Sequence, residues 1–213
     1  MKPTRSLLLA AGLSLLAAPA SAHVGVGDTS SFAAGFGHPL FGLDHLVVMI
    51  AVGAWAAMKG GRALWAWPVA FVAVMLIGGG LGMVGVAVPF VEPAILASVV
   101  ALGLLVALAV DLPVWAGGPI VGLFALFHGH AHGSEIPAIA NGLDYAAGFA
   151  LATAGLHLLG IALATGFGAR FRGAARAAGA ISAAVGIGLF SCLIGNGFHR
   201  THAATAEEAI RGK

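Results

Sequence analysis

The stretch that decides the fold is ALWAWPVAFVAVMLIGGGLGMVGVAV, residues 63–88. No charged side chain occurs between Arg62 and Glu92. A helix needs about 20 apolar residues to cross a bilayer. This run is long enough to do so, and it therefore predicts a membrane-spanning helix.

The composition of the whole chain agrees with that run. Of its 213 residues, 60% are hydrophobic and only 8% are charged, whereas a soluble domain has about 25% charged residues. We therefore predict an all-α integral membrane protein whose partner is the lipid bilayer. The formal net charge of +2 comes with no basic cluster, which gives no reason to expect nucleic acid as a partner.

Outward from residues 63–88, further apolar segments predict a total of six transmembrane helices in a single domain. The other five segments are residues 39–58, 93–110, 113–127, 143–167 and 174–195.

The first 22 residues have the pattern of a cleavable signal peptide. Lys2 and Arg5 precede a short apolar stretch, and Ala20-Ser21-Ala22 is a typical cleavage site. We predict a mature domain of residues 23–213, although an uncleaved first helix is an alternative. Cleavage would give His23 a free amine beside its imidazole, which makes it a less certain metal ligand.

Loop charge predicts the orientation, because Lys and Arg concentrate in cytoplasmic loops. Lys59 and Arg62 follow the first span, and Arg170, Arg172 and Arg176 lie between the fifth and sixth. These loops are therefore expected on the cytoplasmic side of the cytoplasmic (inner) membrane, with both mature termini in the periplasm.

The first polar motif is His38-Pro-Leu-Phe-Gly-Leu-Asp44-His45. Ionisable groups within apolar segments are functional candidates by default. If one helix begins at His38, then His38, His45 and the less certain Met49 share a face. Asp44 would then be a flanking ligand or would hold a histidine ring.

The second motif is Phe127-His128-Gly-His130-Ala-His132-Gly-Ser-Glu135. In a continuous helix His128, His132 and Glu135 form one stripe and His130 points away, whereas a break at the glycines would let all three histidines surround one ion. The fifth span begins near Asp144 on the same side, so Asp144 is a less certain ligand. Together these groups predict one metal site, because imidazole with carboxylate binds late first-row ions.

His157 lies halfway along the fifth span. It is either a neutral imidazole bonded to a neighbouring helix or a deeper position on an ion path, and it is also a less certain ligand.

Both motifs, in this order and after a signal peptide, resemble the HupE/UreJ family of nickel and cobalt permeases, which are accessory to hydrogenase and urease. The segment His38-x5-Asp44-His45 matches the first family motif and 127–135 the second, in which His130 is variable. The larger nickel/cobalt permease family has one residue fewer in its first motif, so this chain is not a member of it.

The resemblance implies uptake of Ni²⁺ or Co²⁺ as cargo, with no cofactor and no enzymatic reaction. No Walker motif is present, so an ATPase subunit is not evident in this chain. The alternative is an intramembrane zinc or di-iron enzyme that modifies lipids, in which Ser134 and Glu135 would take part. The sequence does not choose between nickel and cobalt.

Overall fold

The computed structural model describes residues 31–136, 141–166, 173–184 and 186–188. The predicted signal peptide, His23 and the C-terminal tail lie outside these residues. Within them the protein is all-α and no strand occurs.

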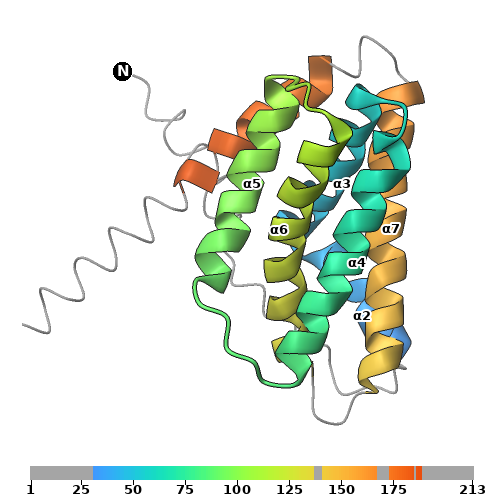
Figure 1. Cartoon of the computed structure of the whole chain (residues 1–213), viewed down its shortest axis with the longest axis vertical. Helices are drawn as coiled ribbons and strands as arrows, with labels where there is room; N and C mark the ends of the chain where they lie inside the picture. The colour runs from blue at the N-terminus through green and yellow to red at the C-terminus, as the bar shows by residue number, and fades with distance from the viewer. Residues whose placement is uncertain (1–30, 137–140, 167–172, 185, 189–213) are drawn as a thin grey trace, which may run out of the picture.

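The helices follow the apolar segments of the sequence closely. In chain order they are α2 (Ser31–Phe41), α3 (Leu43–Lys59), α4 (Ala63–Met83), α5 (Val91–Ala107), α6 (Val114–Ser134) and α7 (Gly142–Gly166). Residues 173–184 and 186–188 are also helical. Helices α3 to α7 stand side by side in Figure 1.

The expected single helix over residues 39–58 is wrong at its start. Gly42 adopts an extended conformation between α2 and α3, and the two helix axes differ in direction by 82°. Pro39 lies inside α2 rather than in the first turn of a spanning helix. His38 therefore lies in the last turn of α2 and does not share a helix face with His45 and Met49.

Among the described residues, α4 and α7 are long and apolar enough to cross a membrane, and the broken pair α2–α3 makes a third candidate span. Helix α5 is apolar but shorter, and α6 carries three histidines in its last two turns. The apolar side chains Trp65, Val69 and Ile77 of α4 are exposed, as expected for a surface that faces lipid. A count of six spans stays a prediction, because residues 189–195 lie outside the described part.

Glycines allow two sets of helices to pack with their backbones in contact. A Cβ on Gly129 or Gly133 of α6 would overlap the backbone of α4, and a Cβ on Gly53 of α3 would overlap that of α7. Small residues at such positions are typical of helix association in membranes. The most extensive helix contacts are accordingly α4 with α6, and α7 with α2 and α3.

The Lys and Arg side chains of the described residues gather at one end of the bundle. Lys59 forms an ion pair with Asp111 in the α5–α6 connection, and the Arg176 Nε donates to the Ala107 carbonyl. At this end the rings of Trp55 and Trp67 contact each other at an interplanar angle of 33°. Their N–H groups donate to the carbonyls of Val110 and Val114, respectively. The motif histidines lie toward the opposite end.

Candidate metal site

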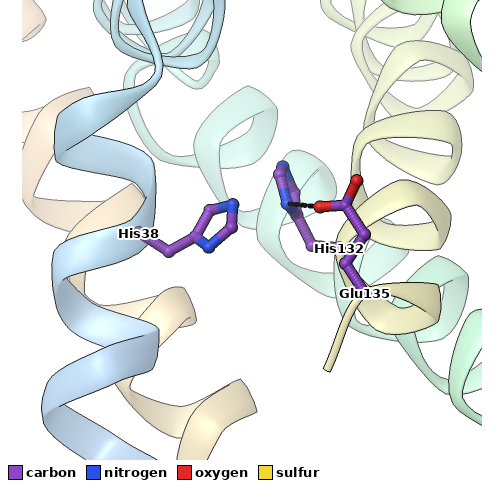
Figure 2. A group of neighbouring side chains, drawn as sticks. All are labelled: His38, His132 and Glu135. Atoms are coloured by element: carbon purple, nitrogen blue, oxygen red, sulfur yellow. Dashed lines mark ion pairs between the residues drawn. The ribbon is translucent and has the colours of Figure 1, made fainter. Parts of the chain in front are cut away.

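The ends of three helices bring the two sequence motifs together. The last turn of α2, the first turn of α3 and the last turns of α6 surround one volume. Figure 2 shows His38 of α2 facing His132 of α6, with Glu135 beside it. We call this group the histidine cluster; it consists of His38, Asp44, His45, His128, His132 and Glu135.

The centre of the cluster is a pair of imidazoles that face each other. The Nε2 atoms of His45 and His132 are 2.6 Å apart. On the far side of the first ring, the His45 Nδ1 lies 2.8 Å from an Asp44 carboxylate oxygen. Because the carboxylate only accepts hydrogen bonds, Nδ1 carries the proton, and the Nε2 of neutral His45 presents its lone pair to His132.

The second carboxylate lies farther from its ring. The His132 Nδ1 is 3.7 Å from Glu135 Oε2, which is beyond hydrogen-bond distance, and it has no hydrogen-bond partner among the described residues. Because the His45 Nε2 accepts, the His132 Nε2 donates across the 2.6 Å contact, and Nδ1 of a neutral His132 ring carries the lone pair. The cluster thus contains one hydrogen-bonded carboxylate–histidine pair and a second carboxylate close to the facing ring.

His128 contributes a third ring, held by a buried serine of α5. The Ser98 hydroxyl donates to the Ile95 carbonyl over 2.6 Å, so the 2.8 Å contact with His128 Nε2 requires that ring nitrogen to donate. The His128 Nδ1 then carries a lone pair, and within the described part of the chain it is buried without a hydrogen-bond partner. The rings of His128 and His45 are 4.8 Å apart at their centroids, so this lone pair is available beside the cluster.

Ser98→Ala is expected to weaken nickel binding about tenfold, because loss of a group that orients a metal-binding histidine costs 10–100-fold in affinity. Titration of the purified protein with Ni²⁺ measures the effect. Ser134→Ala is the matched control, since the Ser134 hydroxyl also donates to a carbonyl three residues earlier but is exposed. Equal affinities in the two variants would contradict this role of Ser98.

The outer rim of the cluster is made by His38 and Glu135. One ligand atom from each of His38, His132 and Glu135 lies within 4.8 Å of the others, a spacing that one ion can bridge. The neighbouring His132 holds the pKa of the Glu135 carboxyl below its usual value, so Glu135 is ionised at neutral pH.

Aromatic rings and an opening adjoin the cluster. The Phe149 ring lies 4.7 Å from that of His132, and Tyr145 and Phe149 lie about 6 Å from His38. A cleft of about 240 Å³ between α4, α6 and α7 reaches His132 and is otherwise mostly apolar. The cluster is therefore accessible although its central rings are buried.

The other sequence candidates lie outside the cluster. His130 donates its Nε2–H to the Val86 carbonyl, and this agrees with α6 continuing through the glycines. Met49 is buried in the apolar core. Asp144 is exposed, and none of the ion pairs among the described residues joins it to a histidine. His157 is buried deeper, in α7.

Sequence reasoning missed Ser98 and Phe149. A signal for Ser98 was available, because it is the one polar side chain in the run 93–110. Phe149 gave no such signal, since aromatic residues are common in apolar helices.

Comparison with known proteins identifies the family to which the chain belongs. The model of the HupE/UreJ protein family matches residues 11–189. Protein HupE of Rhizobium leguminosarum bv. viciae is 49% identical over 179 residues, which cover 83% of this chain and 94% of that protein. No solved structure matches significantly. The chain is therefore a membrane protein that belongs to the HupE/UreJ family, which is associated with nickel and cobalt transport.

Proposed function

We propose that this protein imports Ni²⁺ or Co²⁺ across the cytoplasmic membrane and that the histidine cluster captures the ion on the outer side. The observation that carries the proposal is the 2.6 Å approach of the His45 and His132 Nε2 atoms, with the Asp44 carboxylate bonded to one ring and Glu135 close to the other. An ion that displaces the shared proton would gain two imidazole ligands at once.

The charges of the cluster suit a divalent ion. With neutral histidines, Asp44 and Glu135 supply two negative charges, which compensate a divalent cation at a site where unpaired charge is costly. Imidazole nitrogens favour late first-row metals over Mg²⁺ or Ca²⁺, which prefer oxygen ligands. The ligand set is thus compatible with nickel and with cobalt.

The distribution of basic residues supports inward transport from the periplasm. Lys59, Arg62 and Arg176 lie at the end opposite the cluster, and basic residues favour the cytoplasmic side. This distribution supports a cluster in the outer half of the membrane, and the proposed orientation has both mature termini in the periplasm.

The test is accumulation of radioactive nickel and cobalt in cells that lack their own uptake systems. We expect accumulation well above that of cells carrying the empty vector, and the ion taken up faster identifies the preferred cargo. Purified protein in liposomes should also move the ion inward. Metal that stays bound without crossing, together with turnover of lipid, would instead support the intramembrane metalloenzyme.

A further inference from the structure

His157 of α7 is a buried imidazole. Only 1% of its surface is exposed, and neither Nδ1 nor Nε2 has a hydrogen-bond partner among the residues that the structure describes. A neutral imidazole has one donor and one acceptor, and leaving each of them unsatisfied in a core costs about 1–3 kcal/mol. A buried imidazole with unused ring nitrogens is therefore able to receive a ligand.

The surroundings of His157 contain further donor atoms. On α4, Phe71 and Met75 are one helical turn apart, and on α7, Thr153 and His157 are likewise one turn apart. The Phe71 ring lies 5.1 Å from that of His157, and the Thr153 hydroxyl donates to the Met75 sulfur over 3.7 Å. All four side chains are almost completely buried, so α4 and α7 enclose imidazole, thioether and hydroxyl groups between them.

Ring contacts connect His157 to the histidine cluster. The centroid of the Phe71 ring lies 5.1 Å from that of His157 and 6.1 Å from that of His128. Along α7, His157 is twelve residues beyond Tyr145, which corresponds to about 18 Å. His157 therefore lies well inside the bundle, in the direction of the basic end.

We infer that His157, together with Met75 and Thr153, forms a second and weaker binding station for the transported divalent ion. This inference rests on the proposed function. Imidazole and thioether are ligands for late first-row metals. Phe71 separates this station from the cluster, so an ion would pass the ring on its way inward.

The station is expected to bind more weakly than the cluster because its donors carry no negative charge. Weak binding suits this position, since conduction requires an ion to leave each site again. A path with a tight outer site and a weak inner one favours release on the far side.

The test compares two substitutions of similar volume. His157→Leu removes every donor atom, whereas His157→Met retains a thioether. In liposomes, nickel uptake by His157→Leu is expected to fall about tenfold, the size of effect seen when a metal site loses a supporting group. His157→Met is expected to keep a substantial part of wild-type uptake, and nickel binding at the cluster should be unchanged in both variants.

Cobalt absorption supplies a second measurement that does not depend on transport. Titration of detergent-purified wild type with Co²⁺ should give two phases of visible absorption, and His157→Leu should lose only the weaker one. A single phase in wild type, a weaker phase that persists in His157→Leu, or equal loss of uptake in the Leu and Met variants would overturn the inference. Failure of wild type to transport would overturn the proposed function, while the titration would still decide whether His157 binds the ion.

Discussion

Cells that express His45→Ala are expected to accumulate no more nickel than cells without the protein. The substitution removes one of the two facing Nε2 atoms and leaves the Asp44 carboxylate without the ring that it orients. Uptake of radioactive nickel at matched membrane levels measures the effect. No other single change in the cluster removes a ring that contacts both His128 and His132.

His130→Ala is the matched control for this prediction. His130 is also a buried histidine, only two residues from His132, but its ring bonds to the Val86 carbonyl. We expect this variant to retain most of its uptake. Equal loss in both variants would show that any buried histidine is needed for folding, and would remove the evidence for a specific role of His45.

Gly129→Ala is expected to lower the stability of the protein by about 1–3 kcal/mol, as is typical when a well-packed core is overfilled. A Cβ at Gly129 would overlap the carbonyl of Met75 and the amide of Gly79. Both are backbone atoms, so α4 and α6 would have to separate. Thermal unfolding in detergent measures the shift, and the amount of protein in the membrane should fall with it.

The control on the same helix is Gly118→Ala. A Cβ at Gly118 meets no atom within 4 Å, so this change is expected to be neutral or slightly stabilising, since alanine favours helix over glycine. A similar loss of stability in both variants would mean that close approach of α4 and α6 does not limit stability.

The sequence predicted the positions of the helices well because apolar runs bounded by loops leave few alternatives. Residues 63–88 contain α4, and the span expected at 143–167 is within one residue of α7 at both ends. The bend at Gly42 could not be predicted in this way. Glycine permits an extended conformation but does not require it, and the choice depends on the packing of α2 against α7.

The structure brings the residues of the histidine cluster together, but the sequence did not predict how their rings would be held. Spacing placed His128, His132 and Glu135 on one stripe if the helix continued, and it left His130 as a less certain ligand if the helix broke at the glycines. Which nitrogen of each ring is free depends on partners distant in sequence, such as Ser98 for His128. Asp144 lies in the first turn of α7, yet it is exposed, because position along a helix alone does not fix which way a residue faces. The binding of a metal by these residues stays a prediction.

The close glycine contacts divide the helices into two tightly packed groups. Helices α4 and α6 are locked together by backbone contact, and so are α7, α2 and α3, whereas contact between the two groups is sparser. His38, Asp44 and His45 belong to one rigid body, while His132 and Glu135 belong to the other. A hinge motion between the bodies would change the distance between the facing imidazoles with little change inside either body, so under the proposed function the seam that binds the ion would also be the one that opens to release it.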